Sequence, residues 1–396
     1  MLFQLLDEKD SCYAAYVDGN FFYDDIPIGL TKTWKYSNSL KDKNIEYAKL
    51  YCGGLSLGEV CPAHLKEQFD SVNDKLKAFM VSFSQAKISL SDNCFYNLVP
   101  ERYLLELSYV KDKICEHVFE NYDKPKNYDF LLELEKIIDK LKAQELKIDK
   151  TQLKNRLSEY KVRQFYNKLN NISPFVSYNM FGTKTGRLST SKGSFPILTM
   201  DKTYRKVLAP KNEWFVELDY NAAELRTMLA LLGKKQPDGD IHDWNVKNIY
   251  NDLLTREEAK KKIFAWLYNP NSKDGVLNRT YDRDEIVEKY WNGSRVKTCF
   301  HREIESDKFH ALNYIIQSTF SDIVLRQVIA LDKILEGRKT KIAFVIHDSV
   351  VLDMSAEDEH LMNEIFHGFE NTMFGKFKAN VSAGKNFGSM KKLWIH

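Results

Sequence analysis

The sequence predicts an α+β fold, and three observations support that class. Residues 12–23 alternate in polarity around Asp18–Gly19, a pair that suits a two-residue hairpin because both turn positions need a positive φ. From Pro62 onward, apolar residues recur at helical spacing over long stretches. Residues 341–353 form two apolar runs that meet at His347–Asp348, which predicts a pair of strands. Strands and helices thus occupy separate blocks, as is typical of α+β proteins.

The first part of the chain, residues 1–75, is predicted to be a small α+β region. It contains the hairpin and a second expected strand at 45–52, which ends in two glycines. A helix follows, and one of its faces carries Leu65, Phe69, Val72, Leu76, Phe79 and Phe83. Further helices are expected near 101–121, 128–147 and 150–170.

Residues 171–211 contain several glycines and prolines and are expected to form loops and short strands. The elements expected after this segment are a strand at 214–218, a helix at 222–232, helices through about residue 336, the two strands of 341–353, a helix at 357–374 and a strand at 379–383.

The composition is that of a globular protein. Hydrophobic residues make up 43% and charged residues 29% of the 396 positions. The opening MLFQLLDEKD has too short an apolar run for a signal peptide, and no run approaches the roughly 18 apolar residues of a membrane span. We therefore expect no membrane association and a cytoplasmic location, the host cytoplasm if the protein is viral. Six cysteines without a C-x-x-C pair are expected to be reduced packing residues.

The net charge of +3 hides an uneven distribution. Acidic residues gather within 7–25, whereas lysines and arginines crowd 140–168, 184–211 and the last 21 residues. Such runs are either solvated surfaces or a track for a polyanion, since phosphate binding needs local positive charge. Charge alone leaves both interpretations open.

Two aspartates occupy positions typical of metal ligands. Asp219 ends an apolar strand, and Asp348 lies where one apolar strand turns into the next. Carboxylates held on a rigid sheet suit a pair of Mg²⁺ ions roughly 3.5–4 Å apart, which stabilise the attacking and leaving oxygens of phosphoryl transfer. For either residue taken alone, a turn or capping role is the more common explanation.

The segment TREEAKKKIFAWLYN adds a third element. Its residues Arg256, Lys260, Phe264 and Tyr268 recur every four positions and so share one slowly winding stripe of a helix. Two cations followed by two aromatic rings could bind a triphosphate at one end and stack on a base and sugar at the other. Without other motifs, a basic helix tip with an aromatic core stripe is the more common explanation of the pattern.

Five motifs in order resemble those of family A DNA polymerases, the group of bacterial DNA polymerase I and many phage replicases. They are TGRLSTS at 185–191, DYNAAELR at 219–226 (motif A), R-x3-K-x3-F-x3-Y from Arg256 (motif B), N-x3-Q at Asn313 and Gln317, and IHDS at 346–349 (motif C). The resemblance covers roughly the last half of the chain and extends to the closing GKNF segment. It implies a right-hand polymerase with a palm built on an antiparallel sheet and with helical fingers and thumb.

The resemblance also implies roles at the reacting centre. Asp219 and Asp348 would hold two Mg²⁺ ions, for which Mn²⁺ can substitute, and the Tyr220 backbone carbonyl would lie near a metal. Glu224 would close over the incoming sugar and reject a 2′-hydroxyl. Arg256 and Lys260 would bind the triphosphate and act in catalysis.

Other matched residues would bind the nucleotide base or the DNA. Phe264 would pack beside the nucleotide and Tyr268 near the templating base. Because the first of these rings is Phe, the family pattern suggests poor acceptance of dideoxynucleotides. Asp240-Ile241-His242 resembles a weaker nucleotide-binding stretch, although a loop cap explains it equally well. The residues expected at the DNA are Thr185, Arg187, Arg226, Asn313, Gln317 and His347. Minor-groove acceptors are nearly the same in every correct pair, so donors there test pair shape.

Some positions depart from the family pattern. Ser349 stands where the family usually has Glu, which removes a third acidic residue near the metals. Asn269 replaces the usual Gly after the tyrosine of motif B. Phe309 occupies the place of an expected Arg, with Lys308 or His310 as substitutes. No Asp-x-Glu pair precedes the thumb-like helices, so we expect no 3′–5′ exonuclease.

The sequence therefore predicts a compact, phage-type DNA polymerase that extends a primer with dNTPs, releases pyrophosphate and serves replication or repair. The predicted parts are an N-terminal region (1–75, a reduced exonuclease or docking unit), a thumb (76–180), a first palm part (181–233), fingers (234–306) and a second palm part (307–396). Expected partners are primer–template DNA, dNTPs, and a processivity factor, helicase/primase or exonuclease subunit. The alternatives are a single-subunit RNA polymerase or primase, an inactive nucleic-acid-binding descendant, and a metal-dependent nuclease.

Overall fold

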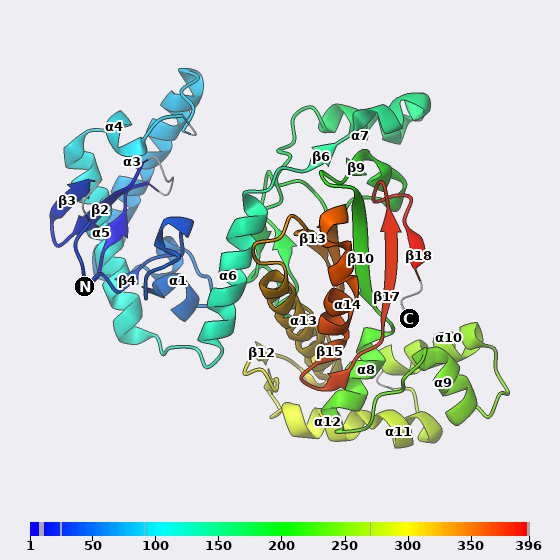
Figure 1. The fold of residues 1–396 in the computed structure, drawn as a ribbon. Coiled ribbons are helices and arrows are strands. Elements are labelled where there is room, and N and C mark those ends of the chain that lie inside the picture. Colours follow the sequence, from blue (N-terminus) through cyan, green and yellow to red (C-terminus); the bar gives the residue numbers. More distant parts are fainter. Residues whose placement is uncertain (8–11, 24–25, 91, 270, 394–396) are drawn as a thin grey trace. The chain divides into compact units, whose positions relative to one another are not determined.

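The computed structural model describes residues 1–7, 12–23, 26–90, 92–269 and 271–393. These residues form two compact units, Met1–Asp139 (unit 1) and Lys140–His396 (unit 2) (Figure 1). The boundary lies inside the helical segment that the sequence analysis assigns to a thumb, and helix α6 (Tyr128–Lys142) runs across it. The predicted division into five parts therefore stays a proposal.

Unit 1 contains short strands in a mixed arrangement. Strands β1 (Gln4–Leu5), β2 (Ala14–Val17) and β3 (Asn20–Tyr23) are antiparallel neighbours. Strands β4 (Lys32–Thr33) and β5 (Glu46–Tyr47) pair in parallel, and a parallel bridge joins Leu2 to Lys32. The predicted hairpin is confirmed, because Asp18 and Gly19 form its turn with φ values of 46° and 85°.

The predicted strand at 45–52 is wrong beyond Tyr47. From Ala48 the chain forms helix α1 (Ala48–Tyr51), which buries Ala48 and Leu50. A short apolar run fits a buried helical turn as well as a strand, so periodicity could not separate the two.

The helices of unit 1 pack around one apolar core. The expected helices are confirmed as α3 (Lys66–Gln85) and α5 (Glu101–Asn121), which pack against each other. The predicted apolar face of α3 meets this core through Val72 and Phe83. The shorter elements are η1 (Asn38–Leu40), α2 (Leu57–Val60), η2 (Ala63–Leu65) and α4 (Phe95–Leu98).

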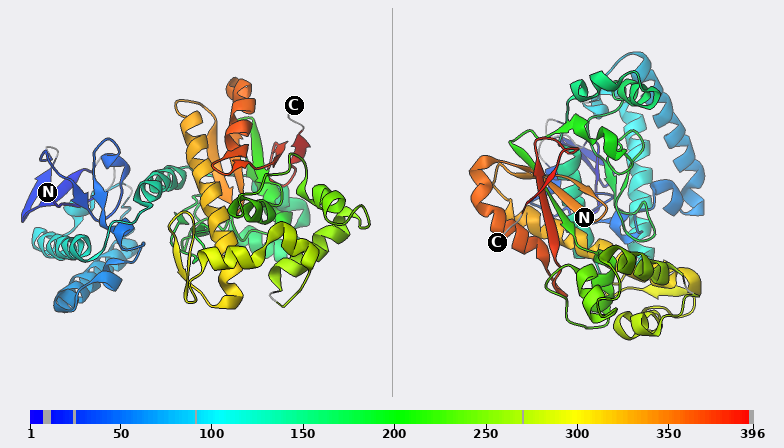
Figure 2. Two further views of the ribbon diagram at one scale, coloured as in Figure 1. Left: turned by 90° about the horizontal axis from the view of Figure 1, so that it is seen from below. Right: turned by 90° about the vertical axis from the view of Figure 1, so that its right-hand side faces the viewer.

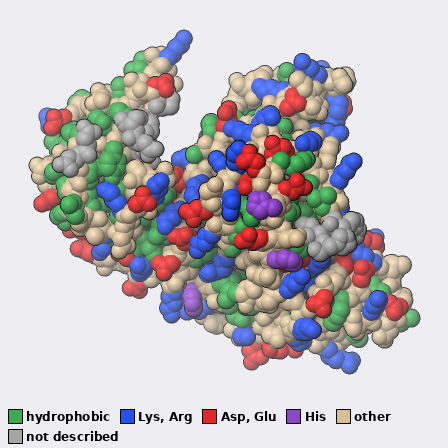
Figure 3. Space-filling view, viewed as in Figure 1, with side chains coloured by type: hydrophobic (Ala, Val, Ile, Leu, Met, Phe, Trp, Pro, Cys, Tyr) green, Lys and Arg blue, Asp and Glu red, His purple; other side chains and the backbone are tan. Residues whose placement is uncertain are grey.

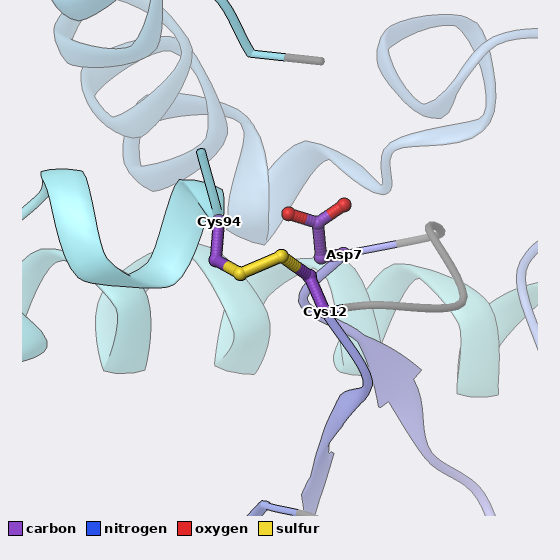
Figure 4. A group of neighbouring side chains, drawn as sticks. All are labelled: Asp7, Cys12 and Cys94. Carbon is purple, nitrogen blue, oxygen red and sulfur yellow. A yellow bond between two sulfur atoms is a disulfide. The ribbon is translucent and has the colours of Figure 1, made fainter. Parts of the chain in front are cut away.

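A disulfide joins Cys12 to Cys94 in unit 1 (Figure 4). The prediction that all six cysteines are reduced is therefore wrong. The two Cα atoms lie 5.4 Å apart, within the range that a disulfide can span, although 82 positions separate them in sequence. Asp7 lies beside this bond and accepts a hydrogen bond from the backbone N–H of Phe95.

Unit 2 is built on a five-stranded antiparallel sheet in the order β13-β14-β10-β17-β18. Its strands are β10 (Trp214–Tyr220), β13 (Lys341–Ile346), β14 (Ser349–Met354), β17 (Ala379–Gly384) and β18 (Lys391–Leu393). Strands β13 and β14 form the predicted hairpin, with His347 and Asp348 as its two turn residues. Strand β10 lies between β14 and β17, which places its end in the middle of the sheet.

Helices α13 (Lys308–Ile334) and α14 (Met362–Glu370) cover one face of this sheet (Figures 1 and 2). Alternate residues of β10 point to that face, where Tyr220 stacks on Phe369 with ring centroids 4.3 Å apart. The intervening residues Glu217 and Asp219 point to the opposite face and are only partly buried. The pleat of one strand therefore separates core residues from acidic ones.

The remaining elements of unit 2 differ from the prediction mainly at their ends. The helix expected at 150–170 is two pieces, η3 (Lys150–Arg156) and α7 (Tyr160–Lys168), because Asp149 caps the first piece and the chain turns before the second. The helix expected at 357–374 consists of η5 (Ala356–Leu361) and α14. Helix α6 ends at Lys142 rather than near 147.

The predicted helix at 222–232 is α8 (Ala223–Leu231), and the helices through 336 include α13. The other helices are η4 (Lys202–Val207), α9 (Ile241–Asn248), α10 (Arg256–Tyr268), α11 (Gly275–Tyr281) and α12 (Arg283–Tyr290). The paired short strands are β6 (Lys147–Ile148) with β9 (Leu208–Ala209), β7 (Tyr178–Asn179) with β8 (Ser189–Thr190), β11 (Arg295–Lys297) with β12 (Glu303–Glu305), and β15 (Asn371–Thr372) with β16 (Gly375–Lys376). Within the described ranges, no helix has the length and apolarity that crossing a membrane requires.

Candidate active site

A pocket of about 330 Å³ lies in unit 2 where β10, the β13–β14 hairpin and α10 meet. It brings together nine residues that the sequence singled out: Arg187, Asp219, Tyr220, Glu224, His242, Arg256, Lys260, Phe264 and Asp348. They come from segments up to 161 positions apart, and their convergence depends on the fold.

Asp219 lies near the end of β10, opposite Ser349 of β14 and Asn380 of β17. Burial, the charge of Asp348 and the charge of Glu217 raise the pKa of Asp219 to about 7, against a smaller opposing effect of Lys202. Within the described part of the chain, neither Asp219 nor Asp348 has a hydrogen-bond or ion-pair partner for its carboxylate. The cations that line the pocket, Arg187, Arg256 and Lys260, therefore do not pair with these two carboxylates.

This pair fits divalent cations of the Mg²⁺ type. Carboxylate oxygens are the ligands that Mg²⁺ prefers, and a cation between two facing acids would relieve the repulsion that raises the pKa of Asp219. Tyr220 contributes only its backbone to the pocket, because its ring is buried on the other face and its hydroxyl donates to the Phe369 carbonyl.

The described residues contain one group of three potential metal ligands whose ligand atoms lie within 4.8 Å of one another, namely Asp7, Cys12 and Cys94 in unit 1. The two sulfurs of that group form the disulfide, so neither offers a thiolate to a metal.

Glu217 is an acidic neighbour of the pocket that the sequence motifs do not include. It lies two residues before Asp219 on the same face of β10, and its carboxylate accepts hydrogen bonds from Ser349 Oγ (3.1 Å) and Ser382 Oγ (3.3 Å). The period of two along a strand is a signal that could have identified it.

Helix α10 carries the predicted stripe of cations and rings. Thr255 caps it in a reciprocal capping box with Glu258. Arg256 pairs with three carboxylates, those of Asp240 (2.8 Å), Glu257 (2.9 Å) and Asp243 (3.6 Å). A triphosphate would have to compete with these acids for its guanidinium group, whereas Lys260 is exposed.

The aromatic half of the stripe lies at the pocket's edge. The rings of Phe264 and Tyr268 stack with centroids 6.1 Å apart, and His242 lies 6.0 Å from Phe264. Burial lowers the pKa of His242, which keeps its imidazole neutral at pH 7. The Tyr268 hydroxyl donates a 2.6 Å hydrogen bond to Glu224, and burial together with this bond raises the pKa of Tyr268 well above its usual value.

Asp240 has a structural role at this place. Its carboxylate caps α9 by accepting from the backbone N–H groups of His242 and Asp243. Although burial opposes the effect, hydrogen bonds from Arg256 and Asn221 lower the pKa of Asp240 far below its usual value. The loop-cap interpretation of this stretch therefore describes Asp240 itself, while His242 lines the pocket.

Arg226 requires a correction. The sequence analysis places it at the DNA, but its side chain is completely buried. Its guanidinium group donates to the backbone carbonyls of Asn221 (2.9 Å), Pro237 (2.9 Å) and Gly239 (2.6 Å), and burial lowers its pKa to about 10. Arg226 thus holds the loop that leads to α9 and has no surface to offer to DNA.

Of the other predicted DNA contacts, Arg187 lines the pocket, whereas Thr185, Asn313, Gln317 and His347 are not among its lining residues. Asn313 lines a neighbouring cavity of about 940 Å³ together with Tyr268, Phe309 and Lys308. Phe309, which stands in place of an expected Arg, is 67% exposed. Thr185 is buried, Gln317 is half-buried, and His347 is exposed with a φ of 51°.

Basic side chains are exposed beyond the pocket as well. On the face that Figure 3 shows, lysines and arginines gather over the segment that carries α7. A further cavity of about 420 Å³ is lined by Arg156, Lys202 and Lys206. These cations come from two parts of the predicted basic track.

No protein-family model matches the sequence, and no curated protein is significantly similar to it. Among solved structures, the chain is similar to the POL domain of Pol1 from M. smegmatis in complex with DNA primer–template and dNTP. The identity is 11%, the match covers 73% of this chain and 76% of that one, and the TM-score is 0.56. The chain therefore has the α+β fold of a polymerase domain.

Proposed function

We propose that the protein is a DNA-directed DNA polymerase that extends a primer 3′ end with dNTPs and releases pyrophosphate. The observation that carries the proposal is the single pocket in which two unpaired acids, an exposed lysine and the Glu224–Tyr268 pair converge on a polymerase fold. Two aspartates with only a structural role in turns would not require the lysine and the Glu224–Tyr268 pair beside them.

Asp219 and Asp348 would hold two Mg²⁺ ions, for which Mn²⁺ can substitute. These ions supply electrostatic stabilisation of the attacking 3′-oxygen and of the leaving pyrophosphate oxygen. Lys260, and Arg256 once released from Asp240, would bind the triphosphate and balance the charge that develops on the leaving group. The 3′-hydroxyl oxygen would attack the α-phosphate and lose its proton to solvent water, while the bond from the α-phosphorus to the pyrophosphate oxygen breaks and pyrophosphate leaves.

Glu224 would select the sugar. Its carboxylate is held by the Tyr268 hydroxyl at the rim of the pocket, so a 2′-hydroxyl there would collide or lose its hydrogen-bond partners. This pair favours a DNA polymerase over a single-subunit RNA polymerase, although IHDS also suits the latter. Phe264 beside it would give poor acceptance of dideoxynucleotides.

The DNA would be bound through several parts of the chain. Arg187, Asn313 and Gln317 would contact the minor groove of the nascent duplex, and His347 would help to place the primer end. The five-part division from an N-terminal region to a second palm part, the absence of a 3′–5′ exonuclease, the compact phage-type origin and an accessory subunit are parts of the same proposal.

Primer extension tests the proposal directly. A labelled DNA primer–template with Mg²⁺ is incubated with dNTPs or NTPs, using the wild type, Asp348→Ala and the surface control Glu364→Ala. We expect extension with dNTPs that is lost only in Asp348→Ala. Efficient use of NTPs would favour the RNA polymerase alternative, and tight DNA binding without extension would favour an inactive descendant.

A second variant tests the sugar gate. Glu224→Ala should incorporate ribonucleotides that the wild type rejects, because the group that faces the 2′-position is removed. Unchanged rejection of ribonucleotides would mean that another residue discriminates between the sugars.

A further inference from the structure

Arg302 lies outside every motif that the sequence analysis identified, yet it contacts the loop that carries Arg187. It immediately precedes β12, and its guanidinium group donates to both carboxylate oxygens of Asp322 on α13, at 2.6 and 3.3 Å. Asp322 is completely buried and the Arg302 side chain is only 15% exposed. Such a fork-shaped pair fixes the guanidinium plane because two donors meet two acceptors.

The pair cannot easily rearrange. Burial raises the pKa of Asp322 and Arg302 opposes that shift, so the ionised carboxylate depends on the guanidinium group. Thr298 closes the turn before β12, because its backbone N–H donates to the Arg302 carbonyl and its hydroxyl accepts from the Arg302 N–H. Arg302 is therefore held at its backbone and at its head group.

Gly186 packs directly against the guanidinium group of Arg302. A Cβ atom at Gly186 would lie 2.4 Å from Arg302 Cζ and 2.5 Å from Nη2. Its φ of 76° also favours glycine, so backbone conformation and space both exclude a side chain. The loop can approach Arg302 this closely only because position 186 is glycine.

The position of Gly186 decides where Arg187 points. Arg187 is the next residue and lines the pocket with Asp219 and Glu224. The turn is closed by the Gly186 N–H to the Thr183 carbonyl (3.3 Å) and by the Thr183 hydroxyl to the Arg187 carbonyl (2.8 Å). A displacement at Gly186 would be passed to Arg187 with little loss, because the turn is short and closed.

We propose that Arg302 is a positioning residue that, through Gly186, holds Arg187 in the pocket for contact with the primer–template. The inference rests on the proposed function, since it assumes that Arg187 binds DNA. Arg302 itself touches neither substrate nor nucleotide and acts only through the loop. It links the β11–β12 hairpin and α13 to the loop at 183–187.

Two glycine variants test the contact without breaking the ion pair. Gly186→Ala inserts a methyl group against Arg302, whereas Gly193→Ala is a matched control with a φ of 84° and nothing within 4 Å of its Cβ. Both carry the strain of a positive φ, and only the first meets Arg302. We expect Gly186→Ala and Arg187→Ala each to weaken primer–template binding by about ten-fold, and Gly193→Ala to change it by less than about two-fold.

The double variant Arg187→Ala/Gly186→Ala decides between positioning and a separate effect. If Gly186 acts through Arg187, the double variant binds no more weakly than Arg187→Ala alone. The proposal would be overturned if the losses of affinity in the two single variants multiplied in the double variant. Equal losses of affinity in Gly186→Ala and Gly193→Ala would also overturn it. The double variant Arg302→Gln/Asp322→Asn removes both charges of this pair together and should give the same ten-fold loss, again without adding to Arg187→Ala.

Binding is measured by fluorescence anisotropy of a labelled primer–template without dNTPs, and extension is measured in parallel. The anisotropy cycle does not depend on catalysis, so a wild type that binds but does not extend would contradict the proposed function while the positioning result still stands. A wild type that neither binds nor extends would overturn both.

Discussion

Asp219 of unit 2 and Asp112 of unit 1 are both half-buried acids whose pKa burial raises, but their neighbours differ. Asp219 faces a second acid, Asp348, and has no donor among the described residues. Asp112, on α5, accepts a 3.2 Å hydrogen bond from the side-chain amide of Gln4 on β1, and that bond opposes the rise in its pKa. Asp112 thus has a hydrogen-bond partner in the protein, and Asp219 has none among the described residues.

The difference is one of hydrogen-bond partners, and it makes Asp219 the candidate for a functional role. A buried carboxylate costs stability unless something pairs with it, so an acid without a protein partner is a candidate for metal or substrate binding. Within unit 1, the acid at the β1–α5 contact accepts a hydrogen bond from an amide, which opposes the rise in its pKa. We expect no metal-dependent chemistry at this contact, and the absence of a 3′–5′ exonuclease stays a prediction.

Replacement of each acid by its amide is the largest test of this contrast. Asp219→Asn removes a proposed metal ligand and should lower the rate of primer extension by at least about 100-fold, since metal stabilisation of the transition state is worth several kcal/mol. Asp112→Asn keeps the contact with Gln4 and should leave the rate within about two-fold. Equal losses in the two variants would remove the distinction between the units.

The candidate residues of the pocket could largely be predicted from the sequence, but their geometry could not. Asp219, Glu224, Lys260 and Asp348 were recognisable because ordered motifs surround them, and the strands that carry the two aspartates are short apolar runs with clear ends. Sequence spacing does not show that the guanidinium group of Arg226 donates hydrogen bonds to three backbone carbonyls. An arginine in motif A could either bind DNA or hold a neighbouring loop. Only the folded loop at 237–239 decides between these two roles.

Contacts between residues far apart in the sequence could not be predicted either, because they depend on the fold. The disulfide joins residues 82 positions apart, and the Arg302–Asp322 pair joins a hairpin to the middle of a long helix. Neither leaves a local signal, because periodicity and capping describe only neighbours within one or two turns. Helix ends were missed where the chain turns within a periodic pattern, as at the break between η3 and α7.

The disulfide gives a second test, because unit 1 has a covalent link and the described part of unit 2 has none. The double variant Cys12→Ser/Cys94→Ser should lower the free energy of unfolding of unit 1 by about 2–4 kcal/mol, since the bond closes a long loop of the unfolded chain. The loss is measured by denaturant unfolding of the full chain.

Two controls accompany that measurement. Cys61→Ser removes a half-buried free thiol and should have a much smaller effect. The wild type in a reducing agent should unfold like the double variant. If reduction leaves the wild type unchanged while the double variant is destabilised, the serines act through packing and not through the bond.

A pH series isolates the repulsion at Asp219. Its carboxyl has a pKa of about 7 in the folded state and about 3.9 in the unfolded state, so between these values the folded state binds more protons. Stability is therefore lost as the pH rises from about 4 to about 7. Asp219→Asn should lack this part of the loss and be more stable than the wild type by about 1–3 kcal/mol at pH 7.5 without divalent ions.

The measurement is the melting temperature of both proteins in a chelating buffer at pH 4.5 and 7.5. Addition of Mg²⁺ or Mn²⁺ should raise the melting temperature of the wild type more than that of Asp219→Asn, because only the wild type keeps both carboxylates. If the difference in melting temperature between the two proteins does not change with pH, the charge of Asp219 does not destabilise the folded state.

The smallest expected effect concerns the satisfied acid of unit 1. Gln4→Leu removes the donor to Asp112 and should cost about 1 kcal/mol of stability at pH 7. The loss of stability is limited by a second effect. The amide oxygen Gln4 Oε1 is a buried acceptor without a partner among the described residues, and leucine removes this unsatisfied atom. Asp112→Asn/Gln4→Leu should lose less than Gln4→Leu alone, since no charge is then left unpaired. Primer extension by both variants should match the wild type, and a loss beyond about two-fold would place this pair in the function of the chain rather than in the stability of unit 1.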